Sequence, residues 1–382
     1  GPPCAGLPKS MSFIFIDREQ DSHSLAEELA DGAPFALDCE AAGFHRYSDR
    51  LCLVQVTTAS GRDFILDALA FDVGAVLKDS LEDASTPVLM HGADYDLRLL
   101  DRDVDTRIRG LVDTQVAASL LGEKSLGLAA LLEKFLGVRL AKKYQRADWA
   151  RRPLPTEMLD YAANDTRHLH ELVGRLQSEL ADAGRVSWAD EEYRTLETVR
   201  WQEDPDEDPV TRVKAARDLP PRIVARLREA LQWRDDVARE QDRAPFRVAP
   251  DPLLVEVAAR QPANVGALAN LKGMNGRLAR SHGDALLERL GRVDAVADTD
   301  VQGYPRRRGN GGPGRPPPEV EELAQRLKGV RNRNAERLGI DRGTLVPNAA
   351  LVEIARAGPR SMEELSALGE LKKWQLDVVG TG

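Results

Sequence analysis

The first half of the chain alternates short apolar runs with longer segments in which apolar residues recur at helical spacing. The short runs are rich in β-branched and aromatic residues, and they predict strands at Phe13–Ile16, Phe35–Glu40, Leu51–Thr57, Phe64–Asp67 and Val88–His91. The longer segments predict helices at Ser24–Ala30, Tyr95–Asp101, Thr114–Leu121, Leu126–Leu136 and Thr156–Leu180. Strands that alternate with helices predict an α/β domain.

The second half shows no strand pattern from about residue 212 onward, and short amphipathic helices broken by Pro and Gly are expected there. Two parts of it resemble each other. Val248-Ala-Pro followed by Leu254-Val-Glu-Val-Ala matches Leu345-Val-Pro followed by Leu351-Val-Glu-Ile-Ala. This similarity favours an internal duplication, with chance likeness of two small helical bundles as the alternative.

Two stretches of unusual composition divide the chain. One is acidic and contains Pro, and the other is rich in Gly, Pro and Arg, and neither composition packs readily into a core. The expected organisation is a disordered or expression-derived tail at 1–11, an α/β domain at 12–200, an acidic linker at 201–211, a helical domain at 212–295, a second linker at 296–317 and a second helical domain at 318–382.

Composition narrows the class of protein. Hydrophobic residues make up 42% and charged residues 30%, and no apolar run is long enough to cross a bilayer, so no membrane role is expected. Three cysteines without paired spacing and the lack of a secretion-signal pattern predict a cytoplasmic protein. The net charge of −9 means that any nucleic-acid binding is local. Basic clusters occur at 139–152 and 306–308, and ordinary solvated surface is their alternative reading.

The first candidate for chemistry is Asp38-Cys39-Glu40, at the end of an apolar strand. Because strand side chains alternate, both carboxylates project from one face, where two hard oxygen ligands suit Mg²⁺ or Mn²⁺. The spacing alone proves little, since Asp17-Arg18-Glu19 has it too. The position at a strand end, where α/β proteins build sites, distinguishes Asp38 and Glu40.

The second candidate is His91-Gly-Ala-Asp-Tyr-Asp96, where a strand ends at His91 and a helix begins near Asp94 or Tyr95. Asp94 is a candidate N-cap, and Asp96 then lies in the first helical turn. A carboxylate there gains from the helix dipole, so simple helix-start chemistry remains an equal alternative for this segment.

The third candidate is Tyr161-Ala-Ala-Asn-Asp165, where helical spacing brings the phenol and the carboxylate onto one face. Tyr144 and Asp148 have the same spacing, but they lie in a Lys/Arg-rich stretch that is typical of a loop, so we interpret them as a decoy. The later pair is preferred because its helix has an apolar face, formed by Met158, Leu159, Ala162 and Leu169.

These three elements, in this order, resemble the DEDDy family of 3′-to-5′ exonucleases. Further segments are similar to its ribonuclease D branch: Leu51-Cys-Leu-Val-Gln-Val, Val112-Asp-Thr-Gln-Val-Ala-Ala and Asp148-Trp-Ala-Arg-Arg-Pro-Leu. The two helical repeats are similar to HRDC domains. The resemblance implies a ribonuclease H-like α/β exonuclease domain, with a mixed sheet flanked by helices, followed by two all-α HRDC-like helical bundles.

The resemblance also implies a mechanism. Asp38, Glu40, Asp96 and Asp165 are expected to hold two divalent metal ions, Mg²⁺ or Mn²⁺, while Tyr161 positions the attacking water. The expected substrates are single-stranded 3′ ends of RNA, including tRNA precursors, and the expected products are nucleoside 5′-monophosphates. The family favours a monomer.

Other assignments stay open at this stage. His91, Lys142 and Lys143 are candidates for substrate binding, against a satisfied strand-end histidine and two solvated loop lysines. The helical repeats are expected either to hold RNA or to pack on the nuclease domain. A DNA-directed 3′-to-5′ exonuclease with the same site, and a catalytically silent RNA-binding scaffold, are the alternative functions.

Overall fold

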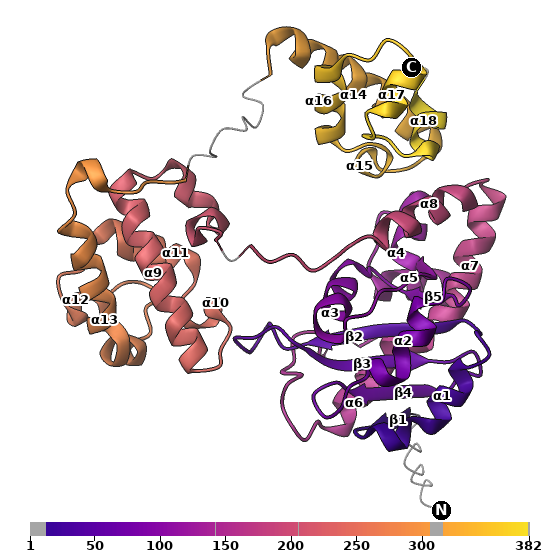
Figure 1. The fold of residues 1–382 in the computed structure, drawn as a ribbon, viewed down its shortest axis with the longest axis horizontal. Helices are drawn as coiled ribbons and strands as arrows, with labels where there is room; N and C mark the ends of the chain where they lie inside the picture. The colour runs from indigo at the N-terminus through magenta and orange to yellow at the C-terminus, as the bar shows by residue number, and fades with distance from the viewer. Residues whose placement is uncertain (1–12, 142, 205, 306–315, 381–382) are drawn as a thin grey trace, which may run out of the picture.

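The computed structural model describes residues 13–305 and 316–380, except positions 142 and 205 (Figure 1). Its sheet has six strands in the order β1-β4-β3-β2-β5-β6. β1–β4, β2–β5 and β5–β6 are parallel pairs, and the two pairs that β3 makes, with β2 and β4, are antiparallel. The strands are β1 Phe13–Ile16, β2 Phe35–Ala41, β3 Leu51–Thr57, β4 Asp63–Asp67, β5 Val88–Met90 and β6 Leu111–Asp113.

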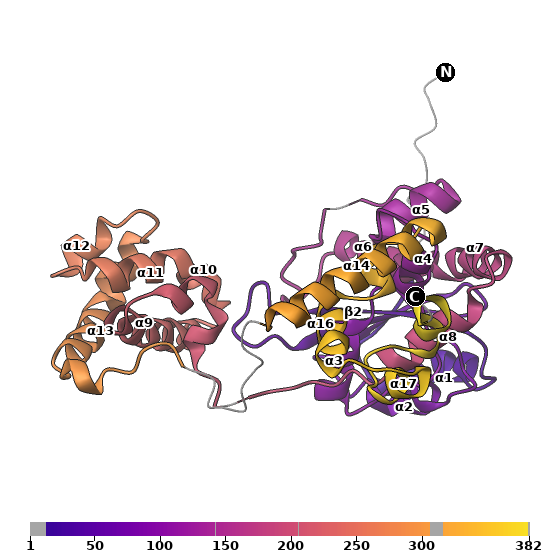
Figure 2. The ribbon, with the colours of Figure 1, turned by 90° about the horizontal axis from the view of Figure 1, so that it is seen from above.

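Helices flank this sheet on both faces (Figures 1 and 2). They are α1 His23–Leu29, α2 Gly74–Glu82, α3 Asp94–Val104, α4 Thr114–Leu120, α5 Leu128–Leu136, α6 Thr156–Arg167, α7 Leu169–Asp182 and α8 Val186–Leu196. The expected fold class, a mixed sheet flanked by helices and followed by helical bundles, is confirmed. No helix within the described ranges has the length and apolar character that a membrane span requires.

Several local expectations were wrong. Strand β6 and helix α2 were not predicted from the sequence. β6 has only three residues, and no helical periodicity was recognised over α2. The helix expected over Thr156–Leu180 is two helices that meet at His168. Asp94 is not the N-cap of α3 but its first residue, and its carboxylate accepts hydrogen bonds from the Arg98 guanidinium one turn later.

The remaining helices form two repeats. The first repeat contains α9 Pro221–Glu240, α10 Pro245–Val248, α11 Asp251–Arg260, α12 Val265–Ala269 and α13 Gly276–Asp294. The second repeat contains α14 Pro318–Leu338, α15 Arg342–Leu345, α16 Asn348–Ala357, α17 Met362–Ala367 and α18 Lys373–Val379. One constant offset in residue number relates the first residue of every helix pair, which supports the duplication. Three of these helices are longer than the sequence suggested, namely α9, α13 and α14.

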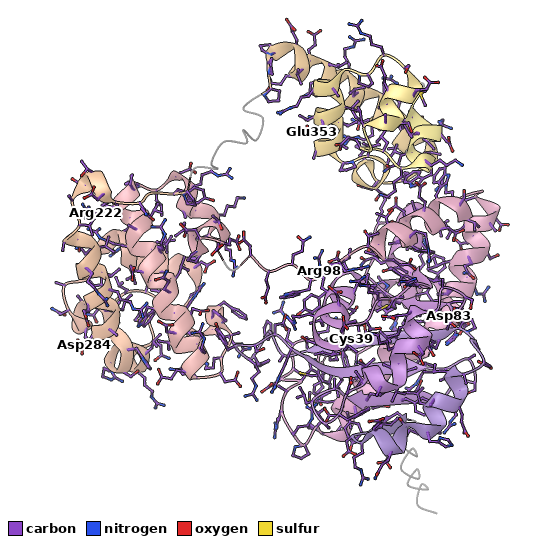
Figure 3. The ribbon with its side chains drawn as sticks, viewed as in Figure 1. Cys39, Asp83, Arg98, Arg222, Asp284 and Glu353 are labelled. Atoms are coloured by element: carbon purple, nitrogen blue, oxygen red, sulfur yellow. The ribbon has the colours of Figure 1, made fainter. Side chains whose placement is uncertain are left out.

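The second repeat shares a core with the nuclease domain, where side chains of α8 and α18 meet (Figure 3). The rings of Trp188 and Trp374 stack with centroids 4.7 Å apart. Glu191 accepts hydrogen bonds from the backbone N–H groups of Lys373 and Trp374, at 2.8 and 3.0 Å, and so satisfies the N-terminus of α18. The indole N–H of Trp374 donates to Glu192 at 2.9 Å. This repeat is therefore part of the nuclease body.

The first repeat reaches the nuclease domain through the loop between β2 and β3 (Figure 1). The backbone N–H of Ala244 donates to the carbonyl of His45 at 3.1 Å. Tyr47 donates its hydroxyl to Asp235 at 2.9 Å, and the Phe44 ring lies 5.5 Å from that of Phe246. Of the nuclease domain, the partly buried Tyr47 packs against the core of this repeat.

The backbone of Gly122, in the nuclease domain, lies close to the backbone of Gly339 in the second repeat. Gly122 has φ +83°, and a Cβ there would collide with the carbonyl oxygen of Gly339. We expect Gly122→Ala to destabilise the docked state by more than about 1 kcal/mol, because both the backbone conformation and the contact oppose a side chain. Faster amide hydrogen exchange in α18 is the readout.

Gly127→Ala is the matched control. Gly127 has φ −70°, and an added Cβ would meet no atom within 4 Å. Exchange in α18 should stay at the wild-type rate in this variant. Equal exchange in both variants would show that the backbone contact at Gly122 does not hold the second repeat in place.

Candidate active site

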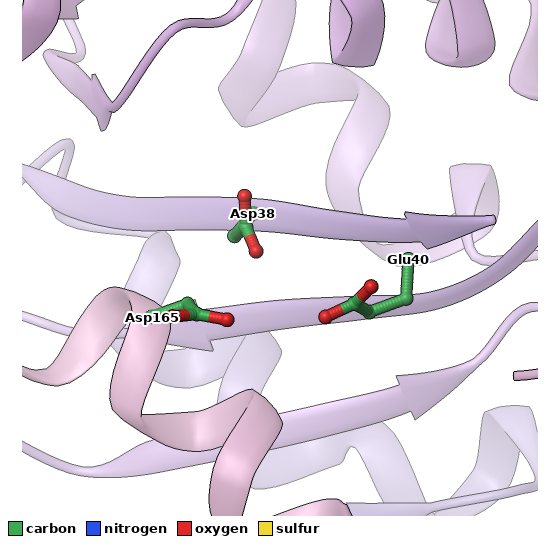
Figure 4. Close-up of side chains that lie close together, drawn as sticks. All are labelled: Asp38, Glu40 and Asp165. Atoms are coloured by element: carbon green, nitrogen blue, oxygen red, sulfur yellow. The ribbon is translucent and has the colours of Figure 1, made fainter. Parts of the chain in front are cut away.

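Asp38 and Glu40 lie on β2, in the interior of the sheet, and their side chains project from the same face (Figure 4). Asp38 is opposite Gln55 of β3, and the strand register shifts directly after Glu40. The Gln55 amide N–H₂ donates weakly to Glu40 at 3.5 Å, while the Gln55 carbonyl oxygen is buried without a partner among the described residues. A polar residue inside an otherwise apolar strand was the signal that could have identified Gln55.

Asp165 comes from α6, which packs across β2, β3 and β4. Two neighbours of Asp165 fix this helix. The Thr166 hydroxyl lies 2.8 Å from that of Thr57, and Arg167 donates to Asp63 at 2.7 Å. The expected apolar face of the helix is buried, at Met158, Leu159 and Ala162. The position of Asp165 is therefore set by contacts on both sides of it.

The three carboxylates of Asp38, Glu40 and Asp165 point toward one another, with one oxygen of each within 4.8 Å of the others (Figure 4). Burial raises the pKa of Asp38 to about 7, and burial together with the charge of Asp38 raises the pKa of Asp165 to about 8. Burial, Asp38 and Asp165 raise the pKa of Glu40 well above its usual range. Within the described part of the chain no Lys or Arg forms an ion pair with these three groups. A bound cation would stabilise the ionised form of these three carboxylates.

Asp96 is the fourth predicted acid, and it lies buried in the first turn of α3. Burial, followed by the nearby negative charge of Asp38, raises the pKa of Asp96 well above the usual range. It does not belong to the set of three whose oxygens converge within 4.8 Å. Its assignment as a metal ligand stays a prediction.

Asp113 orders the turn in front of Asp96, and sequence reasoning did not single it out. Its carboxylate accepts hydrogen bonds from the backbone N–H groups of Gly92 and Ala93, at 3.1 and 2.7 Å. It also caps α4. Asp113 thus connects the start of α3 to β6, and the quoted segment Val112-Asp-Thr-Gln was the signal for it.

Tyr161 lies between two aromatic rings. Its ring is 5.7 Å from Tyr144 in an edge contact and 6.4 Å from Trp149 in a stacked one. Burial, followed by the charge of Asp165, raises the pKa of the Tyr161 phenol above its usual value. The phenol therefore remains protonated at neutral pH.

The two residues of the earlier pair, Tyr144 and Asp148, lie in different surroundings. Asp148 accepts a two-pronged contact from Arg46, at 3.1 and 2.8 Å, and lies outside the acidic cluster, in agreement with the decoy interpretation. Tyr144, however, packs on Tyr161 and lines the same cleft. Sequence reasoning did not anticipate this packing of Tyr144.

A small cleft of about 170 Å³ opens beside Tyr161 and Asp165, and Lys143 lies on its wall. This position agrees with the substrate-binding hypothesis for Lys143 but does not test it. Lys142 lies outside the described residues. The Nδ1 atom of His91 is 2.9 Å from the Thr114 hydroxyl, and burial lowers the pKa of its imidazole. Its contacts match the satisfied strand-end histidine that was the alternative reading.

Comparison with known proteins covers most of the chain. The family model described as 3′-5′ exonuclease matches residues 13–181, and the model described as HRDC domain matches residues 223–290 and 320–382. The exact domain boundaries expected from the sequence stay a prediction.

Three similar proteins illustrate the match. Ribonuclease D of Pseudomonas paraeruginosa is 28% identical, over 94% of each chain. The exosome complex exonuclease RRP6 of Saccharomyces cerevisiae is 30% identical over 68% of this chain, which spans only 37% of that protein. The structure of a protein from Bifidobacterium adolescentis, 25% identical, superposes with a TM-score of 0.79 over 97% of this chain and 95% of that one.

The order of domains, an exonuclease domain followed by two HRDC domains, is consistent with these matches and with the fold. Over most of its length the chain is therefore similar to ribonuclease D, with a match to the 3′-5′ exonuclease family at residues 13–181 and to HRDC domains at residues 223–290 and 320–382.

Proposed function

We propose that this chain is a metal-dependent 3′-to-5′ exoribonuclease that releases nucleoside 5′-monophosphates. The observation that carries the proposal is the convergence of the Asp38, Glu40 and Asp165 carboxylates beside the Tyr161 phenol. A ribonuclease D is similar to this chain over 94% of both sequences. The match to the 3′-5′ exonuclease family includes the three acids and Tyr161.

The donor set fits divalent ions. Asp38, Glu40 and Asp165 would hold them, with Asp96 as the fourth acid, because carboxylate oxygens are the ligands that Mg²⁺ and Mn²⁺ prefer. Bound ions of this kind supply positive charge at the scissile phosphate and acidify a water molecule. The raised pKa values of Asp38 and Asp165 support the proposal. They indicate that no nearby positive charge among the described residues stabilises the ionised carboxylates, and a bound cation would supply that charge.

The chain's own residues position the reactants. A phenol has a reference pKa of about 10, so we expect Tyr161 to act as a hydrogen-bond donor that orients the attacking water and not as the base. Tyr144 and Tyr161 offer aromatic faces on which terminal bases can stack. Lys143, on the cleft wall, is placed to meet a backbone phosphate.

The proposed substrates are single-stranded 3′ ends of RNA, with tRNA precursors as the expected class, and the proposed active form is a monomer. The aromatic lining of the cleft favours an unpaired end over a duplex, because stacking needs exposed base faces. A DNA-directed enzyme would use the same acids, so substrate preference has to be measured directly.

Asp38→Asn should lower the rate of RNA shortening by at least about a hundredfold, because it removes one negative ligand oxygen from the site. The measurement is stepwise shortening of 3′-tailed RNA and matching DNA, with and without Mg²⁺ or Mn²⁺. Asp17→Asn is the matched control, since the exposed Asp17-Arg18-Glu19 has the same spacing.

Equal loss of activity in both variants, or wild-type activity in Asp38→Asn, would contradict the proposed site. Equal shortening of RNA and DNA would leave the site in place but broaden the substrate. No shortening of either nucleic acid by the wild-type chain would favour the scaffold alternative.

Tyr161→Phe should lower kcat about 10- to 100-fold with little change in KM, because a hydrogen bond to a charged group contributes about 1.5–3 kcal/mol. The dependence of kcat on alkaline pH should remain, since the phenol is a donor and not the base. Tyr193→Phe is the control, because the Tyr193 hydroxyl is buried without a partner among the described residues. A Tyr161→Phe enzyme with wild-type kcat would remove Tyr161 from the mechanism.

The raised pKa of Asp38, about 7, predicts a pH-dependent cost to the metal-free fold. The unfolded chain loses this proton near pH ~3.9, so between there and pH 7 the folded state holds more protons, and stability falls as pH rises. In chelator at pH 8, Asp38→Asn should therefore melt at a higher temperature than wild type, and the difference should vanish near pH 4. Mn²⁺ should raise the melting temperature of wild type more than that of Asp38→Asn. A lower melting temperature for Asp38→Asn at pH 8 would contradict this account.

A further inference from the structure

A cleft of about 690 Å³ lies on the first repeat, between α10, the turn that precedes it and the start of α13. The charged side chains that line it are all arginines, namely Arg243, Arg247, Arg277 and Arg280. All four are exposed, and no carboxylate lines the cleft. In a chain with a net charge of −9, this is a local concentration of positive charge.

These arginines differ from their neighbours in having no acidic partner. Every arginine of α9 pairs with a carboxylate, as Arg226 does with Asp294 at 2.6 Å and Arg234 with Asp251 at 2.6 Å. Within the described residues the four cleft arginines form no ion pair. Arg243 donates instead to the backbone carbonyl of Arg247 at 3.1 Å. Their positive charge therefore remains available to an anionic ligand.

The surface of the second repeat that corresponds to the arginine cleft has a different composition. By the constant offset between the repeats, Arg243, Arg247, Arg277 and Arg280 correspond to Ile340, Thr344, Trp374 and Asp377. There, Trp374 stacks on Trp188 and the carboxylate of Glu191 meets the start of α18. In the second repeat this face is therefore docked through Trp374, whereas in the first repeat it is basic and open.

The ring of Phe44 joins the cleft to the loop that follows β2. This ring lies between Arg247 of the first repeat and Arg146 of the nuclease domain, at 4.8 and 5.6 Å from the guanidinium carbons, and it contacts the exposed ring of Phe246. Phe44 follows β2, the strand that carries Asp38 and Glu40. Basic and aromatic side chains therefore extend from the loop after β2 to the cleft.

We propose that the four-arginine cleft of the first repeat binds the phosphate backbone of single-stranded RNA upstream of the nucleotide being removed. This proposal extends the proposed function and rests on it, because the 3′-to-5′ direction of hydrolysis decides which part of the RNA lies in the cleft. Phosphate contacts of this kind are independent of sequence and weaken with salt. The two repeats then have different tasks, RNA binding for the first and docking for the second.

The test measures binding without hydrolysis. Full-length protein in chelator is titrated into a 5′-labelled single-stranded RNA long enough to reach from the active site to the cleft, and fluorescence anisotropy gives Kd at several salt concentrations. Arg277→Ala combined with Arg280→Ala should weaken binding about tenfold and reduce the slope of log Kd against log salt by about two. Hydrolysis of a trinucleotide in Mn²⁺ should keep its wild-type rate.

Arg292→Ala is the control, because Arg292 lies on the same helix, outside the cleft, and pairs with Glu288. It should bind the long RNA like wild type. Wild-type Kd and salt slope in the double variant would overturn the proposal, and so would an equal loss in Arg292→Ala. Because the binding assay contains no metal, these results stand even if the chain proves to cleave nothing, so failure of the inference and failure of the proposed function are distinguishable.

Discussion

The mutual repulsion of buried carboxylates is the constraint on which this structure depends. Asp38, Glu40 and Asp165 converge within 4.8 Å, where burial and like charge both oppose ionisation. Such an arrangement lowers the stability of the metal-free fold, and the divalent cation that we propose here would compensate for it. The rest of the nuclease domain serves to keep these groups together: β2 lies inside the sheet, and Thr166 and Arg167 fasten α6 to β3 and β4.

Much of this could be predicted from the sequence. Alternation along β2 placed Asp38 and Glu40 on one face, and helical spacing placed Tyr161 and Asp165 together, because both are local periodicities. The features that sequence reasoning missed depend on contacts between residues far apart along the chain. Tyr144 lines the cleft beside Tyr161 only because its loop folds back onto α6, and the Asp113 carboxylate reaches the turn before α3. The three-residue strand β6 is too short to show periodicity.

The two helical repeats share one scaffold, and only the second is docked through this face. Their helices keep the same spacing along the chain, yet the side chains on one shared face have diverged. Trp374 gives the second repeat an apolar anchor on the nuclease domain, whereas Arg277 stands at the equivalent position of the first. The contacts of the first repeat run through the loop that follows β2, so the surface proposed for RNA and the acidic cluster share one segment of chain.

The central claim is that the acidic cluster is a divalent metal site. Anomalous diffraction from crystals grown with Mn²⁺ tests it most directly, because the peaks locate the metal without reference to activity. The account predicts Mn²⁺ peaks among the carboxylates of Asp38, Glu40 and Asp165, with Asp96 adjoining them. A structure with Mn²⁺ bound elsewhere and none at these three carboxylates would contradict it.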